Sequence, residues 1–162
     1  MADKKNNIIV IDDGTRELIL KNQFGAVICK LHIRTSDLSL MDRYDALMHD
    51  LGDVVAPLST IGIKADGTAE FDAEWAVIKK VEADLTKRLS ALFDTDEISA
   101  IFQHRHMFSS IGGEFFVEKV LNALGAEISK AIKEENELSK KRVSKYLHDV
   151  QPEAVADDRI TS

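Results

Sequence analysis

The order of apolar and polar residues near the N-terminus is typical of β-strands. Residues 8–11, IIVI, are β-branched, and the turn-forming residues DDG follow at 12–14. Residues 16–21 have the composition of another strand. Residues 26–34 alternate between apolar and polar side chains, and a period of two is typical of a strand buried on one face. The pattern predicts an antiparallel hairpin or three-stranded meander over about residues 8–34, with an inward face of Val27, Cys29, Leu31 and Ile33.

Beyond residue 35, apolar residues recur every three or four positions, which is the period of an amphipathic helix. Asp37 precedes the first such stretch and is a residue type that caps helices. Gly52 is predicted to end the first helix, and residues 52–70 are predicted to be a loop. The pattern predicts four helices, the last of them long, over about residues 38–51, 72–93, 95–103 and 114–147.

Local motifs define the third predicted helix and the segments after it. Asp94, with Glu97 three positions later, resembles a capping box at the start of a helix. Residues 104–113 are predicted to be a loop that ends in two glycines. Residues 151–162, QPEAVADDRITS, have few apolar anchors and are predicted to be a disordered tail.

Together these elements predict one domain of the α+β class over residues 1–150. Its β element is expected at about residues 8–34 and its helical part at about residues 38–148, before the tail at 151–162. A chain of 162 residues is long enough to bury a hydrophobic core.

Composition and charge narrow the function classes. The formal net charge is −7, whereas nucleic-acid-binding proteins are more often basic because they neutralise phosphates. No apolar run approaches the ~20 residues that span a bilayer. The polar start, MADKKNN, is not followed by the apolar core of a signal peptide. We therefore expect a cytoplasmic protein that binds neither nucleic acid nor membrane.

Residues with catalytic or metal-binding chemistry form no recognisable motif. His104 and His106 stand two positions apart without further ligands, so we interpret them as polar loop residues rather than as a zinc site. Cys29 is the single cysteine, and its alternate neighbours are apolar. We interpret it as a buried strand residue rather than as a nucleophile beside His32. The sequence predicts no catalytic residue, no cofactor and no metal.

The end of the last predicted helix is a candidate for association. Its apolar stripe is strong up to Ile132, and the helix then continues for about four turns with few apolar residues. Acidic residues come first in this stretch and basic residues last, so two copies could pair antiparallel, with 134–137 of one against 140–145 of the other. We expect a homo-oligomer. The candidate partner-binding residues are Phe108, Phe115, Phe116, Leu138, Val143, Tyr146 and Leu147.

Several strings occur in an order that is typical of one group of phage proteins. A strand with a Phe-Gly turn, FGAVICKLHIR, is followed by TSDLSLMDRYDAL and later by the acidic LFDTDEISAIFQ. A glycine-bearing loop and GGEFFVEKVLNALGAEISKAI come next, and a charged helix ends in KRVSKYL. This order resembles that of the small tail assembly chaperones of long-tailed phages and prophages of Gram-positive bacteria. The resemblance covers about residues 16–148 and includes no catalytic signature.

The resemblance implies a non-enzymatic role in the host cytoplasm. Chaperones of this kind bind the long helical tape measure protein before the tail tube assembles around it, and they are often oligomeric. Two other classes stay open beside this one. The chain could be a structural tail or head-completion protein whose hairpin joins a neighbour's sheet. It could also be a small phage-encoded inhibitor or regulator of a host protein.

Overall fold

The computed structural model describes residues 6–60 and 71–157. An antiparallel hairpin comes first, formed by β1 (Thr15–Lys21) and β2 (Val27–Arg34). The pairing starts at Thr15↔Arg34, and the register shifts between Leu20 and Lys21. The side chain of Asn22 closes the turn by accepting hydrogen bonds from the backbone N–H groups of Phe24 (2.9 Å) and Ala26 (3.0 Å). The sequence-based prediction of a hairpin is confirmed.

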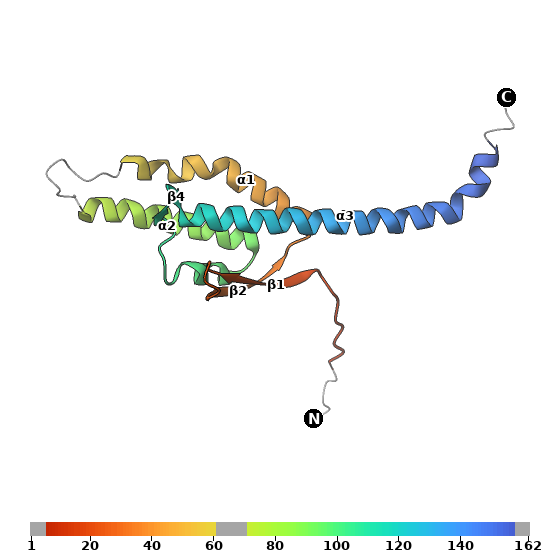
Figure 1. Cartoon of the computed structure of the whole chain (residues 1–162), viewed down its shortest axis with the longest axis horizontal. Helices are drawn as coiled ribbons and strands as arrows, with labels where there is room; N and C mark the ends of the chain where they lie inside the picture. Colours follow the sequence, from red (N-terminus) through yellow and green to blue (C-terminus); the bar gives the residue numbers. More distant parts are fainter. Residues whose placement is uncertain (1–5, 61–70, 158–162) are drawn as a thin grey trace.

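Residues 8–11 form no strand, so the prediction of a β segment there is wrong. These four apolar side chains are between 78% and 90% exposed, and Figure 1 shows the segment leading away from the rest of the molecule. A strand requires a neighbouring strand with which to exchange hydrogen bonds, and composition alone does not supply one. The carboxylates of Asp12 and Asp13 accept hydrogen bonds from the backbone N–H groups of Gly14 and Thr15, which fixes the turn where β1 begins.

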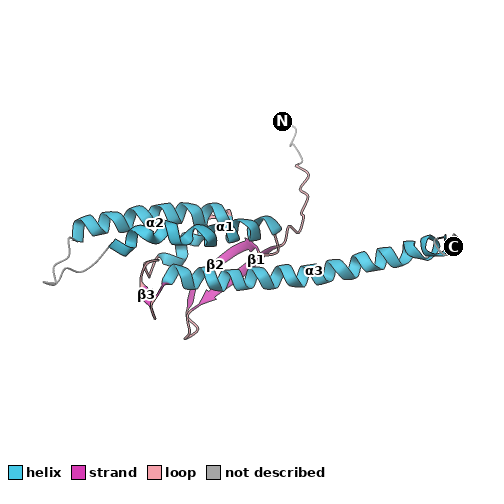
Figure 2. Cartoon of the chain, turned by 90° about the horizontal axis from the view of Figure 1, so that it is seen from above, coloured by secondary structure: helices cyan, strands magenta, loops and turns pink. Residues whose placement is uncertain are grey.

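Two antiparallel helices follow the hairpin. In α1 (Leu38–Val55), Asp37 is the N-cap, and its carboxylate accepts a hydrogen bond from the backbone N–H of Ser39 at 2.9 Å. Gly52 does not end this helix as predicted; the chain remains helical through Val55 and passes into the 3₁₀ helix η1 (Ala56–Thr60). The other helix is α2 (Phe71–Phe93), which packs against α1 (Figure 2). Residues 61–70 of the predicted loop lie outside the described residues.

The third predicted helix is the 3₁₀ helix η2 (Asp96–Phe102) rather than an α-helix. The predicted capping box is also wrong. Thr95 is the N-cap, and Asp94 has a positive φ of 52°. The glycine loop after η2 contains a small hairpin of β3 (Ser110–Ile111) and β4 (Glu114–Phe115). Gly112 and Gly113, with φ values of 63° and 89°, form its turn.

The last element, α3 (Phe116–Asp157), extends well beyond the others in both views of the chain (Figures 1 and 2). It starts two residues later than predicted, because Glu114 and Phe115 belong to β4. It also continues past residue 150, where the disordered tail was predicted to begin. Residues 158–162 of that tail lie outside the described residues. No helix in the described part of the chain is both long enough and apolar enough to cross a bilayer.

The core lies between β2, α1, α2, η2 and the first half of α3. Cys29, Leu31 and Ile33 of β2 and the stripes predicted for α1 and α3 supply most of it, which confirms the periodicity of the sequence. Val27, predicted on the same inward face, is instead 54% exposed, beside the register shift that ends the pairing of β1 with β2. Leu18 and Leu20 of β1 pack on this core from the hairpin. The most completely buried large side chains include Leu31, Leu40, Leu85, Leu89, Ile98 and Leu121.

Candidate interaction surfaces

In the described part of α3 beyond residue 133, no apolar side chain packs on the hydrophobic core. Ile132 is the last apolar side chain of the helix that packs on the core cluster. Along residues 136–147 every side chain is exposed, so we call residues 134–147 the projecting segment. Its large apolar side chains are Leu138, Val143, Tyr146 and Leu147, each between 49% and 59% exposed. Four of the seven predicted partner-binding residues therefore lie on this segment and are accessible.

Two of these four exposed side chains continue the face that α3 turns toward the core. Positions 18 residues apart are separated by about five turns of 3.6 residues and point in the same direction. Leu138 follows the buried Val120 at this interval, and Tyr146 follows the buried Ile128. The projecting segment therefore presents a core-like face without cover from the described part of the chain.

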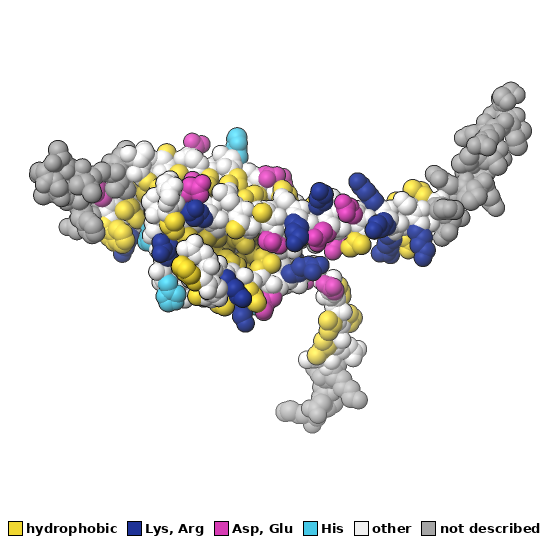
Figure 3. All heavy atoms as spheres, viewed as in Figure 1, with side chains coloured by type: hydrophobic (Ala, Val, Ile, Leu, Met, Phe, Trp, Pro, Cys, Tyr) yellow, Lys and Arg dark blue, Asp and Glu magenta, His cyan; other side chains and the backbone are white. Residues whose placement is uncertain are grey.

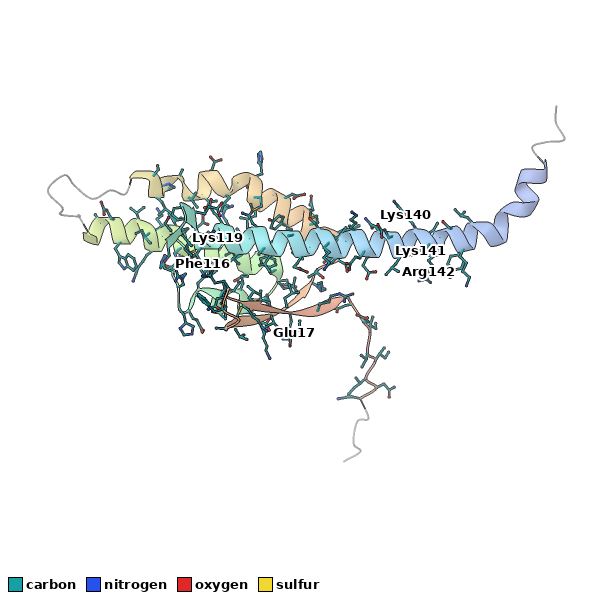
Figure 4. The ribbon with its side chains drawn as sticks, in the orientation of Figure 1. Glu17, Phe116, Lys119, Lys140, Lys141 and Arg142 are labelled. Atoms are coloured by element: carbon teal, nitrogen blue, oxygen red, sulfur yellow. The ribbon has the colours of Figure 1, made fainter. Side chains whose placement is uncertain are left out.

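The charges of the projecting segment change sign along the helix. Glu134, Glu135 and Glu137 come first, and Lys140, Lys141, Arg142 and Lys145 follow, as Figure 4 shows for the three labelled cations. Arg16 of β1 lies 3.6 Å from Glu135, so an ion pair joins the hairpin to α3 where the helix leaves the core. Further along, the guanidinium of Arg142 lies 5.7 Å from the ring centroid of Tyr146.

The three predicted aromatic residues lie elsewhere, around the small hairpin. Phe108 and Phe115 meet edge to face, with centroids 5.5 Å apart, and Phe116 makes a similar contact with Phe102 at 5.8 Å. All three predicted aromatic side chains are half-buried. The seven predicted residues thus divide into two groups, one packed at the start of α3 and one exposed on the projecting segment, and the fold does not bring the groups together.

His106 belongs to the aromatic group rather than to a metal site. Its Nε2 lies 3.0 Å from a carboxylate oxygen of Glu82, and its Nδ1 accepts a hydrogen bond from the backbone N–H of Phe108 at 3.1 Å. The ring also contacts Trp75, with centroids 5.8 Å apart. His104 is exposed. Among the described residues, no three His, Cys, Asp or Glu side chains are placed to hold a metal ion.

Cys29 and His32 lie on opposite sides of β2. Cys29 is in the core, and burial raises the pKa of its thiol, which keeps the thiol protonated. His32 faces outward between two carboxylates: Nδ1 lies 3.0 Å from Glu97 and Nε2 lies 3.1 Å from Glu17. No local pattern in the sequence indicates this cluster, because Glu97 is 65 positions from His32 and the motif around Glu97 resembles a helix cap.

A hollow of about 770 Å³ lies between α1 and α2. Its charged lining carries both signs, and two of these groups, Asp84 and Arg88, pair with each other at 3.3 Å. None of the seven predicted partner-binding residues lines it.

No protein-family model, curated protein or solved structure matches the chain.

Proposed function

We propose that the chain is a non-enzymatic assembly chaperone of a long-tailed phage or prophage, which binds the tape measure protein in the host cytoplasm during tail morphogenesis. The observation that supports this proposal best is the projecting segment of α3. It carries exposed apolar side chains that continue the core-facing direction of the helix. The order of elements, which resembles that of tail assembly chaperones, points to the same role.

The mechanism rests on helix packing. A long helical protein exposes apolar stripes along its length, and such stripes cause aggregation when they are left bare. A helix with a continuous apolar face covers a stripe of this kind by ridge-into-groove packing. In this chain the first half of α3 is fixed in the core, so the projecting segment is held as a preformed helix and loses little further conformational entropy on binding.

The charges of the chain favour solubility of the complex and complement those of an antiparallel helical partner. The formal net charge of −7 favours solubility of an assembly in which the partner's apolar surface is covered. The projecting segment has acidic residues before basic ones, so it complements an antiparallel helix with the same order. Such surface pairs contribute only ~0.2–1 kcal/mol each, and the apolar contacts therefore supply most of the affinity.

A structural tail or head-completion role is supported by a different observation. In the described part of the chain β1 pairs with β2 alone, so the outer edge of β1 is open to a neighbour's strand. A phage-encoded inhibitor or regulator of a host protein would bind a different partner. The partner and the contacting element therefore distinguish the three roles.

The test is co-expression of the full chain with the tape measure protein from the same tail gene cluster. We expect the chain to keep the tape measure protein soluble and to co-purify with it. The double variant Leu138→Ser/Tyr146→Ser should reduce the amount of co-purified tape measure protein at least about tenfold, since apolar anchors dominate such interfaces. The matched control is Leu38→Ser, which removes a leucine at the start of α1 that is 68% exposed, against 58% for Leu138, and should leave binding unchanged.

Three outcomes would contradict the proposal. One is a tape measure protein that stays insoluble beside the wild-type chain. Another is equal binding by the double variant and the control. The third is loss of binding only when Ile19, exposed on β1, becomes Asp, which would favour the structural role through the hairpin edge.

A further inference from the structure

A groove of about 690 Å³ lies beside the turn of the main hairpin, where β2, η2, the small hairpin and the start of α3 meet. Val27 is 54% exposed at its rim. Figure 4 shows Phe116 and Lys119, two of the lining residues, on the first turns of α3. The apolar side chains that line the groove include Phe24, Val27, Ile28, Ile101, Ile111 and Phe116.

The charged side chains of the groove are all basic. Lys21, Arg105 and Lys119 line it, and none of its described lining residues carries a carboxylate. Lys119 is paired with Glu114 at 3.6 Å. Lys21 and Arg105 form no ion pair within the described part of the chain. In a protein with a net charge of −7, this groove is therefore a locally basic and apolar surface, complementary to an apolar segment that carries carboxylates.

The chain itself contains a segment of this chemistry. We call residues 8–13, IIVIDD, the arm. Together with Phe24, its four β-branched side chains are the most exposed large apolar side chains in the described part of the chain, and Asp12 and Asp13 follow them directly. Figure 3 shows the apolar side chains of the arm standing away from the rest of the molecule. An exposed apolar run of this kind is typical of a segment that is covered by another surface.

We propose that the arm of one copy docks in the groove of a second copy, with the apolar run on the apolar lining and the aspartates beside Lys21 and Arg105. A reciprocal exchange of arms gives a closed dimer with twofold symmetry. This inference is independent of the proposed function, because it uses neither the projecting segment nor a phage partner.

The arm cannot satisfy both halves of this contact within its own chain. The carboxylate of Asp13 is held at Thr15, where it accepts hydrogen bonds from the backbone N–H at 3.0 Å and from the hydroxyl. Lys21 lies six residues further along β1, about 20 Å away at ~3.3 Å per residue. An arm folded back along β1 would bring Ile8 toward the groove but would leave the aspartates at the opposite end of the strand. A second copy has no such constraint.

Cysteine cross-linking between full-length chains tests the proposal. One chain carries Ile9→Cys and a differently tagged chain carries Val27→Cys; the native Cys29 is buried in both. A disulfide forms only when the Cα atoms approach within about 7 Å. We expect the mixed disulfide to form roughly tenfold faster than in the matched pair of Ile9→Cys with Leu38→Cys, since docking raises the effective concentration of the thiols.

Charge variants separate docking from chance encounter. Lys21→Glu/Arg105→Glu in the Val27→Cys chain should remove the rate advantage, and Asp12→Lys in the Ile9→Cys chain should restore part of it. Equal rates for the groove pair and the Leu38 pair would overturn the proposal. So would a disulfide that forms within a single chain carrying both cysteines at high dilution, because the arm would then dock on its own groove. Cross-linking that is unaffected by charge reversal would likewise contradict the assigned contacts.

Discussion

Nδ1 of His32 lies 3.0 Å from Oε1 of Glu97, and the backbone N–H of His32 donates a hydrogen bond to Oε2 of the same carboxylate at 2.8 Å. This double contact joins β2 to the start of η2. Glu17 of β1 approaches the other ring nitrogen at 3.1 Å. The hydrogen bond and charge of Glu97, with a further contribution from Glu17, raise the pKa of His32 above its ordinary value of 6.5. The hydrogen bonds from His32 lower the pKa of Glu97 below its ordinary value of 4.5.

These shifts predict how stability depends on pH. A raised pKa means that folding favours protonated His32, so its contribution is complete below pH 6.5 and is lost as the pH rises through the folded-state pKa. Glu97 contributes above pH 4.5, and that contribution is lost as the pH falls through its lowered pKa. We expect His32→Gln to lower the Tm at about pH 5.5 and to have a smaller effect at about pH 8.5, as measured by circular dichroism.

His49 provides the control for this experiment. It is exposed on α1 and forms no ion pair in the described part of the chain, so His49→Gln should leave the pH dependence of the Tm unchanged. An equal loss of Tm in the His32 variant at both pH values would show that the pair contributes through packing rather than through charge.

Gly125 of α3 allows a close approach between that helix and Tyr44 of α1. The hydroxyl of Tyr44 donates a hydrogen bond to the carbonyl of Leu121 at 2.9 Å, and a Cβ at position 125 would overlap the Tyr44 hydroxyl and ring. We expect Gly125→Ala to lower the free energy of unfolding by about 1–3 kcal/mol, because overpacking outweighs the gain in helix propensity. Urea unfolding measures the change.

Gly52 is the matched control, since it also lies inside a helix but a Cβ there meets nothing within 4 Å. Gly52→Ala should therefore raise the free energy of unfolding, by up to about 1 kcal/mol. If the two glycine variants changed stability in the same direction, the close packing of Tyr44 on α3 would be wrong.

The contrast between these two glycines shows what a sequence pattern can predict. Leu40, Leu47 and Leu51 share a face because the period of the helix puts them there, and all three are buried as the pattern predicts. Gly52 was predicted to end that helix because glycine often does so. Its role depended instead on whether the following residues could continue the helix, and they do as far as Val55.

The pattern of apolar and polar residues did not predict contacts between residues that are far apart in the sequence. The acidic string around Glu97 was interpreted as a local cap, but Glu97 binds His32 across the fold and Thr95 caps η2. For the candidate site the sequence predicted which residues of α3 lie beyond the core, because the apolar stripe weakens after Ile132. It did not predict the basic groove, since Lys21 and Arg105 come from elements that only the tertiary fold brings together.

Arg43 caps the end of α2 from α1. Its Nε and Nη2 donate hydrogen bonds of 3.2 Å and 3.1 Å to the carbonyl of Leu92, in a last turn whose carbonyls have no partners within the helix. Arg43→Ala should lower the free energy of unfolding by about 1.5–3 kcal/mol, the range for hydrogen bonds that involve a charged group. Arg43→Lys should recover only part of this loss, because an ammonium lacks the planar fork.

Arg88→Ala is the comparison for Arg43, since the one ion pair that Arg88 forms within the described residues is exposed and joins it to Asp84 on the same helix. That variant should change the free energy of unfolding by less than about 1 kcal/mol. Equal effects of the two arginine variants in thermal or urea unfolding would mean that the Leu92 carbonyl is satisfied without Arg43.

Leu121 and Leu138 lie on the same helix, but we expect Leu121 to contribute to folding stability and Leu138 to association. Leu121 is fully buried, so Leu121→Ala should cost about 2–5 kcal/mol of stability. Leu138 is 58% exposed on the projecting segment, so Leu138→Ser should change stability by about 0.5 kcal/mol or less. It should instead weaken association of α3 with a second copy, in which residues 134–137 of one helix lie against residues 140–145 of the other.

Light scattering over a concentration series measures that association. A background with Ile9→Asp and Ile11→Asp leaves α3 as the contact under test, because it removes docking of the arm. In this background the apparent mass should rise with concentration, and Leu138→Ser/Tyr146→Ser should abolish the rise. Lys140→Glu/Lys141→Glu should reduce it less and mainly at low salt, since each exposed ion pair contributes only ~0.2–1 kcal/mol. A background protein that stays monomeric at every concentration would exclude pairing through α3 and would leave the exposed face of the projecting segment to a different partner.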